Sequence, residues 1–92
     1  MKTMVTWSLK PGALTEAARR FVSGEAGPHK DLTMLGRWHS VDMSIGFAVW
    51  EGDNPVAHYA SAAKWADIMD FKTYMVIEDS DAGPIIASLA KK

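Results

Sequence analysis

The hydrophobic pattern is clearest between Gly36 and Trp50, where it predicts a β-hairpin. Two runs rich in β-branched and aromatic residues flank the turn-prone residues 41–44. If the turn holds two or four residues, Ser40 lies opposite Ile45, and this register decides which side chains share a face. The first face is bulky and apolar, as expected for a packed surface, and consists of Gly36, Trp38, Ser40, Ile45, Phe47 and Val49. The second face consists of Leu35, Arg37, His39, Gly46, Ala48 and Trp50.

The second face of this hairpin is expected to leave space in front of the sheet. It sets the long polar side chains of Arg37 and His39 opposite a glycine and an alanine, with Trp50 on the same face. Space beside a histidine, an arginine and a tryptophan indicates a pocket. A partner subunit could fill the same space, and the pattern does not distinguish the two.

Two further strands are predicted from the alternation of side chains. Residues 2–9 place Thr3, Val5, Trp7 and Leu9 on one strongly apolar side. Near residues 65–70 the periodicity changes, and residues 71–78 then alternate again. Together with the hairpin, these segments predict four strands.

Helical spacing of apolar residues predicts two helices. The first is expected to end at Gly24 and carries Leu14, Ala17, Ala18, Phe21 and Val22 on its inward side. The second is expected to begin at Pro55 after a cap by Asp53 or Asn54. Its predicted inward stripe is Val56, Tyr59, Ala60, Ala63 and Ala66 or Asp67. His58 falls outside this stripe and is expected to be solvated.

The order strand–helix–strand–strand–helix–strand predicts a single α+β domain over residues 1–92 with the ferredoxin-like split βαβ arrangement, βαββαβ. In this topology both helices cover one face of a four-stranded antiparallel sheet, and the other face stays open. Because both faces of the central strands are apolar, a homodimer through the sheet faces is predicted. In the alternative, a monomer, the C-terminal segment would fold across the open face. That segment has a short helix capped by residues 79–81 and carrying Ile85, Ile86 and Leu89.

Composition narrows the class of protein. A domain of this size buries only about 60–65% of its unfolded surface, so a hydrophobic fraction of 48% with four tryptophans favours association. The net charge of −1 comes from scattered charges and indicates no nucleic-acid partner. No apolar run approaches the roughly 18 residues of a membrane span. The absence of cysteine excludes disulfides and thiolate sites, which is compatible with the predicted cytoplasmic localisation.

Several segments of the chain resemble a known family. They are LGRWHS at residues 35–40, GF at 46–47, MVTWSLKPG at 4–12 and WADIMDF at 65–71. Over nearly the whole chain they are similar to small bacterial proteins grouped as a domain of unknown function, number 3303. More distantly, the chain resembles the dimeric α+β barrel superfamily, which includes cofactor-independent monooxygenases, muconolactone isomerases, stress-responsive barrel proteins and haem-degrading enzymes. The resemblance implies a dimeric α+β barrel but no particular activity.

The predicted turn departs from this family in one respect. Asp42-Met43 stands where an aspartate-glycine pair is usual. Methionine tolerates positive φ badly, so a type I′ turn is disfavoured and the register of the hairpin is less firmly set.

Two residues are candidate catalytic groups. An imidazole titrates near neutrality, so His39 could act as a general base, a proton donor or a haem ligand. The alternative is a structural or interface histidine. Arg37 could clamp a carboxylate or stabilise an oxyanion, and the alternative is an ion pair across the dimer.

The candidate ligand-binding residues are aromatic: Trp7, Trp38, Trp50 and Tyr74. They predict a small aromatic or apolar ligand. Trp50 is the strongest of them because it shares a face with the histidine and the arginine, whereas packing is the alternative for the others. The three histidines are ten and nineteen residues apart and form no metal-binding motif, so neither a metal nor a cofactor is predicted.

Three functions are therefore compatible with the sequence. The first is a small homodimeric binding or accessory module for an apolar or aromatic metabolite. The second is a cofactor-independent enzyme of the monooxygenase or isomerase type, in which His39 moves a proton and Arg37 steadies an enolate or phenolate. The third is a purely structural dimerisation module.

Overall fold

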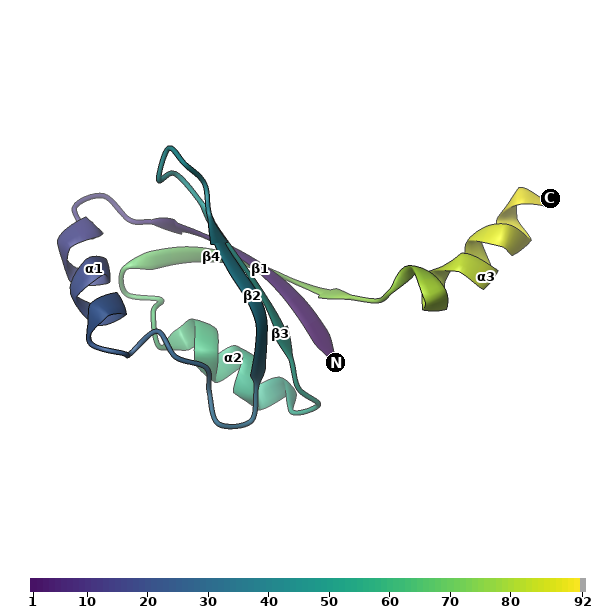
Figure 1. Ribbon diagram of the computed structural model, residues 1–92, viewed down its shortest axis with the longest axis horizontal. Helices are drawn as coiled ribbons and strands as arrows, with labels where there is room; N and C mark the ends of the chain where they lie inside the picture. The colour runs from purple at the N-terminus through teal and green to yellow at the C-terminus, as the bar shows by residue number, and fades with distance from the viewer. Residues whose placement is uncertain (92) are drawn as a thin grey trace.

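A computed structural model, which describes residues 1–91, gives the fold of the chain (Figure 1). The elements follow in the order β1 (Lys2–Leu9), α1 (Leu14–Val22), β2 (Thr33–His39), β3 (Gly46–Glu51), α2 (Pro55–Ala63), β4 (Met69–Val76) and α3 (Asp79–Ala90). The strands form one antiparallel sheet in the order β2-β3-β1-β4. This topology confirms the predicted ferredoxin-like α+β fold.

The β2–β3 hairpin has the predicted register. The backbone N–H of Ser40 donates to the carbonyl of Ile45 at 2.9 Å, so the loop holds four residues. Arg37 therefore pairs with Ala48, and His39 with Gly46. The prediction for Leu35 is wrong, because a register shift between Met34 and Gly36 leaves it as an extra residue that interrupts the alternation.

The arginine–histidine face of the sheet looks toward helices α1 and α2. Side chains of this face line one cavity together with residues of both helices, and they come from every strand: Val5, Trp7, Arg37, His39, Ala48, Trp50, Phe71 and Thr73. The sequence alone did not determine which face of the sheet the helices cover. The helices lie on this side because both pack small residues against it, with Ala17 of α1 and Ala57 of α2 buried.

The other face of the sheet is uncovered. It carries large apolar side chains that are 38–56% exposed: Met4, Trp38, Phe47 and Tyr74. In the register, Trp38 pairs with Phe47, and Met4 lies between Val49 and Tyr74, so these residues are neighbours across all four strands. We call this set, together with Val49, the open face. The predicted packed face of the hairpin is therefore the one that nothing in the described chain covers.

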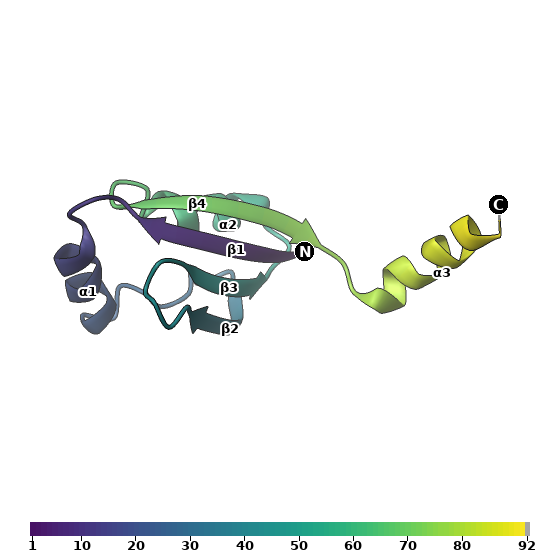
Figure 2. The ribbon, with the colours of Figure 1, turned by 90° about the horizontal axis from the view of Figure 1, so that it is seen from above.

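Helix α3 projects away from the rest of the molecule (Figures 1 and 2). The Cα radius of gyration is 15.8 Å, whereas a compact chain of this length has about 12 Å. Ile85, Ile86 and Leu89 are all about 60% exposed. In the structure, therefore, the C-terminal segment does not fold across the open face as the alternative arrangement predicted. The helix is also capped by the backbone of Glu78 rather than by residues 79–81, and it continues through Pro84.

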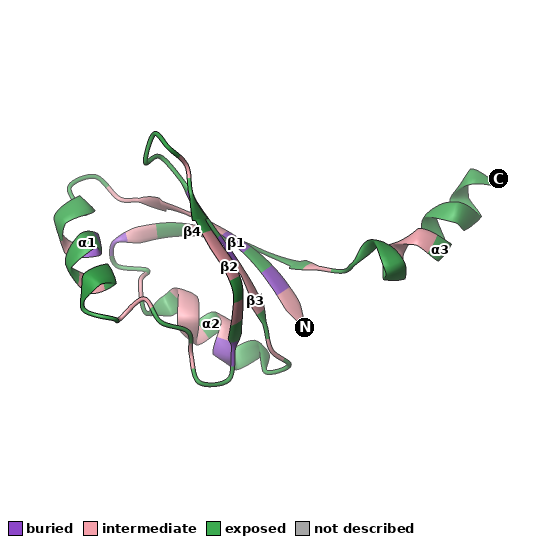
Figure 3. Ribbon diagram, in the orientation of Figure 1, coloured by how far each residue is buried: buried purple, intermediate pink, exposed green. Residues whose placement is uncertain are grey.

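The core is thin, since buried positions are few along the chain (Figure 3), and four of its buried apolar residues are alanines. Its buried apolar members are Val5, Ala13, Ala17, Leu32, Ala48, Ala57 and Ile68. Ala13, Ala17 and Ile68 form one cluster, which the partly buried side chains of Leu9, Trp65 and Met69 extend. This cluster fixes α1 against the segment that leads into β4.

Helix ends form where the sequence predicts them. Asn54 caps α2, because its Oδ1 accepts from the N–H of Val56 at 3.0 Å. Gly24 follows α1 with a φ of +88°, and Glu25 N–H donates to the Arg20 carbonyl at 3.1 Å, as in a Schellman motif. Among residues 1–91 the structure has no helix that is both long and apolar enough to span a membrane.

The inward stripe predicted for α2 is wrong except at Ala60, which lines the cavity described below. Val56 and Tyr59 are 70% and 79% exposed, whereas Ala57 is buried and His58 is half-buried. With five alanine or serine residues among its nine, PVAHYASAA, the helix has little contrast between its sides. Polar contacts of His58, described below, set its rotation instead.

Candidate functional site: a cavity between the sheet and the helices

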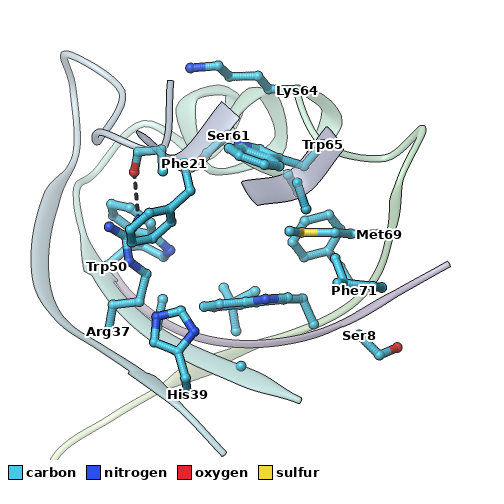
Figure 4. Close-up of a pocket in the computed structure, with 18 of the residues that line it drawn as sticks. Ser8, Phe21, Arg37, His39, Trp50, Ser61, Lys64, Trp65, Met69 and Phe71 are labelled. Carbon is cyan, nitrogen blue, oxygen red and sulfur yellow. Dashed lines mark hydrogen bonds between the residues drawn. The ribbon is translucent and has the colours of Figure 1, made fainter. Parts of the chain in front are cut away.

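A cavity of about 550 Å³ lies between the inner face of the sheet and helices α1 and α2 (Figure 4). This volume is within the range of about 300–1,000 Å³ that is typical of small-molecule sites. The strands supply its floor, and α1 supplies one wall with Leu14, Ala18, Phe21 and Val22. These helix side chains are exposed although they face inward, because the cavity is open to solvent.

Arg37 lies at one end of the cavity. One terminal nitrogen of its guanidinium, NH1, donates to the carbonyl of Ala26 at 2.7 Å, which the dashed line in Figure 4 marks. The guanidinium carbon lies 4.8 Å from the centroid of the Phe21 ring. A cation over an aromatic face at this distance is attracted to it. The arginine is therefore positioned from two sides, by the α1–β2 connection and by α1.

His39 lies beside Arg37, two residues further along β2. Its imidazole meets the rings of Trp7 and Phe21 edge-on, with centroid distances of 5.9 Å in both cases. The hydrogen bonds of imidazoles within residues 1–91 involve His29 and His58 and not His39. Aromatic packing thus orients the His39 ring and leaves its nitrogens available to a ligand.

The opposite end of the cavity is apolar. Figure 4 shows the side chains of Trp65, Met69 and Phe71 together, across the cavity from Arg37 and His39. Rings and a thioether form a surface suited to a flat or hydrophobic group.

The floor of the cavity depends on close packing of Trp7 on Gly46. A Cβ built on Gly46 would lie 2.1 Å from two atoms of the Trp7 ring. Only a glycine therefore allows the indole to lie this close to β3.

Helix α1 is fastened over the cavity by Arg20. Its guanidinium makes two bonds to the carboxylate of Asp67, of 3.0 and 2.6 Å, and lies 5.6 Å from the centroid of the Trp65 ring. The cation holds the pKa of Asp67 below its ordinary value. Glu16 on the same helix pairs with both Arg19 and Arg20, at 2.7 and 3.4 Å.

Sequence reasoning missed the role of His58. Its Nε2 lies 2.9 Å from the carbonyl of Gly52, and its Nδ1 lies 2.9 Å from the hydroxyl of the buried Thr3. A carbonyl only accepts, so Nε2 carries the proton and Nδ1 accepts from Thr3. The expectation of a solvated His58 is wrong, and the signal that was available is the polar Thr3 on the apolar side of β1.

The structure brings four of the six predicted site residues together. Arg37, His39, Trp7 and Trp50 all line the cavity. Trp38 and Tyr74 lie on the open face, because they occupy alternate positions of their strands, and the cavity does not include them. Within residues 1–91, no group of three or more His, Asp or Glu side chains is arranged to hold a metal ion.

Fold and site together define a ferredoxin-like α+β domain with a half-open aromatic cavity between its sheet and its helices. Residues 1–90 match the family described as a domain of unknown function (DUF3303), and the chain belongs to this family. The resemblance of the sequence motifs to this family is thereby confirmed.

Two further comparisons concern solved structures and curated proteins. The chain is similar to an uncharacterized NIPSNAP domain protein from Burkholderia xenovorans, with a TM-score of 0.47 and 10% sequence identity over 84% of this chain and 95% of that chain. No curated protein matches the chain.

Proposed function

We propose that the protein binds a small apolar or aromatic metabolite in the cavity, as a binding or accessory module. The observation that carries this proposal is the lining of the cavity, where aromatic walls surround a few convergent polar groups. Arg37 and His39 supply the polar groups, and Trp7, Trp50, Trp65 and Phe71 supply the walls. We place this activity in the cytoplasm, in line with the sequence-based prediction.

Tryptophan fluorescence tests the binding proposal. Titration with naphthol, naphthoate and related bicyclic compounds is expected to quench the fluorescence saturably, because several tryptophans line the cavity. Ala18→Trp puts a large side chain into the cavity from α1 and is expected to weaken binding about tenfold or more. Thr15→Trp is the matched control, since Thr15 is exposed on the same helix and does not line the cavity.

The outcome of this titration separates the hypotheses. Equal binding by both tryptophan variants would place the ligand elsewhere. The absence of saturable quenching with all compounds would favour the purely structural role.

A second candidate function is cofactor-independent catalysis of the monooxygenase or isomerase type. It is supported by His39, whose imidazole is oriented by Trp7 and Phe21 and is without a hydrogen bond to residues 1–91. A base so placed is suited to remove a proton from an enol or phenol bound beside Arg37. Loss of turnover in His39→Gln with an unchanged melting temperature would support catalysis, and unchanged turnover would exclude His39 from it.

The proposed module is a homodimer in which a second copy covers the open face. The solvent-accessible surface of the single chain is 6456 Å², whereas a compact monomer of this mass exposes roughly 5,300 Å². The difference of roughly 1,150 Å² is larger than the roughly 800 Å² that each partner buries in a standard interface, so the excess is sufficient for such an interface. The apolar side of α3 contributes to this excess of accessible surface, because the helix extends beyond its own sheet (Figure 2).

A further inference from the structure

The charges around the cavity are of one sign. None of the described residues that line it is Asp or Glu, although the chain has eleven. Arg37 and Lys64 line it instead, together with all three histidines. The cavity is thus cationic in a protein whose net charge is −1.

The two cations of the cavity differ in their partners from three other cations of the chain, although Lys10, outside the cavity, likewise donates to a carbonyl, that of Ala66. Lys2, Arg19 and Arg20, which do not line the cavity, each form an ion pair with a carboxylate. Within residues 1–91, neither Arg37 nor Lys64 forms such a pair. Arg37 donates to the carbonyl of Ala26 and Lys64 to that of Glu25, so neutral acceptors hold both side chains.

Arg37 is the better placed of the two to meet a ligand. Figure 4 shows its side chain on the cavity wall beside His39, whereas the amine of Lys64 points along the rim. A guanidinium has five N–H donors in a planar fork, and the protein bond found for Arg37 uses NH1. The remaining donors match the two oxygens of a carboxylate.

We infer that the ligand of the cavity is an aromatic carboxylate, with its carboxylate on Arg37 and its rings against Trp65, Met69 and Phe71. This inference rests on the proposed binding function and specifies it. A half-buried cation without a carboxylate partner favours an anion over a neutral group of the same shape, because a charge-assisted bond forms in a partly desolvated site. Because the polar and apolar ends of the cavity lie apart, such a ligand binds in one orientation, with its carboxylate at the polar end and its rings at the apolar end.

The test compares three bicyclic ligands of nearly the same shape near neutral pH: naphthoate, naphthamide and naphthylmethylammonium. Calorimetric titration of the unmodified protein is expected to give about tenfold tighter binding of naphthoate than of naphthamide. The ammonium compound is expected to bind most weakly. Added salt should weaken naphthoate binding and leave naphthamide binding nearly unchanged.

Variants assign the preference to one residue. Arg37→Gln is expected to remove the tenfold preference by weakening naphthoate, with naphthamide binding retained. Arg37→Lys keeps the charge but not the planar fork, so part of the preference should remain. Lys30→Gln is the matched control, because Lys30 is an exposed cation that does not line the cavity, and it should bind both ligands as the unmodified protein does.

Two possible results of the ligand comparison separate the carboxylate inference from the binding proposal. Equal affinity of the unmodified protein for naphthoate and naphthamide would overturn the inference and leave the binding function intact. Binding of none of the three would contradict the binding function itself. If Arg37→Gln fails to fold, the comparison of ligands on the unmodified protein and on Arg37→Lys still decides the inference.

Discussion

The floor of the cavity depends on the absence of a side chain at Gly46. The ring of Trp7 lies against this residue, and the same ring contacts His39, so one missing side chain positions two site residues. On the other side of the sheet, Trp38 covers Gly36 in a similar way, and a Cβ there would meet the indole at 2.2 Å. The two glycines form a natural pair for comparison.

Gly46→Ala is expected to destabilise the protein by about 1–3 kcal/mol, because the half-buried Trp7 ring must leave its position and its contact with His39. Gly36→Ala is the matched substitution and is expected to cost less than about 1 kcal/mol. Trp38 is 56% exposed and can rotate away. Urea unfolding of both variants measures the difference, and equal losses would contradict a structural role of the Trp7 packing.

The hairpin turn is stabilised by one carboxylate. Asp42 Oδ1 accepts from the Ser44 N–H, the Ser44 hydroxyl and the Ser40 hydroxyl, at 3.0, 2.7 and 2.8 Å. Met43, which lines the mouth of the cavity, has a φ of +66°. Positive φ is unfavourable for methionine, yet the turn forms because Asp42 accepts hydrogen bonds from the polar groups of the turn.

These bonds lower the pKa of Asp42 to about 2 from an ordinary value of 3.8, chiefly through the Ser44 hydroxyl. A carboxyl group whose pKa is lower in the folded state stabilises it above the ordinary pKa, and this contribution is lost as the pH falls through the folded value. We therefore expect the difference in melting temperature between the unmodified protein and Asp42→Asn to shrink between about pH 4 and pH 2. NMR titration of the Asp42 carboxyl gives its pKa directly, and an ordinary value would contradict the bonding described.

At the level of elements, α2 shows how a polar contact can override a hydrophobic pattern. Its composition offers apolar residues on every side, so periodicity does not select the buried one. The bonds of His58 to Thr3 and to Gly52 connect α2 to β1 and to the end of β3. They turn Ala57 inward and leave Tyr59 exposed.

His58→Ala is expected to lower the free energy of unfolding by about 1–3 kcal/mol, because the hydroxyl of Thr3 is then buried without its partner. The control is Tyr59→Ala at the neighbouring exposed position, where a change within about 0.5 kcal/mol is expected. Denaturant titrations measure both. A solvated His58, as the sequence pattern indicated, would make the two substitutions equally mild.

The whole molecule exposes more apolar surface than a stable monomer of this size is expected to. Large apolar side chains are uncovered on the open face and along α3, and also at separate positions such as Tyr59 and Met75, none of which line the cavity. Because the open face is on the far side of the sheet from the cavity, a second copy can cover it without occupying the ligand site.

Sedimentation measurements test the dimer. The unmodified protein is expected to be dimeric at about 1 µM, which corresponds to a free energy of association near −8 kcal/mol or better. Trp38→Glu, on the β2 edge of the open face, should shift it to monomers. Tyr59→Glu adds the same charge on exposed α2 and should leave the dimer intact, and a monomeric unmodified protein would contradict the proposal.

The sequence alone predicted the four strands, both helices between them, a cap of α2 by Asp53 or Asn54, the stop at Gly24 and, for a turn of two or four residues, the pairing of Ser40 with Ile45. These features depend on contacts between residues that are close along the chain, so local patterns specify them. It also placed Arg37 and His39 on one face, because side chains of a strand alternate.

Only the tertiary structure decided that this face of the sheet lies toward the helices and that α2 turns His58 inward. It also decided that Leu35 interrupts the alternation of β2 and that α3 projects away from the rest of the chain. The physical reason is the same in the first two cases. Where both sides of an element are similarly apolar, as in the central strands and in the alanine-rich α2, burying either side yields a similar hydrophobic free energy. Contacts between residues distant in sequence, such as Thr3 with His58 and Arg20 with Asp67, then select one arrangement.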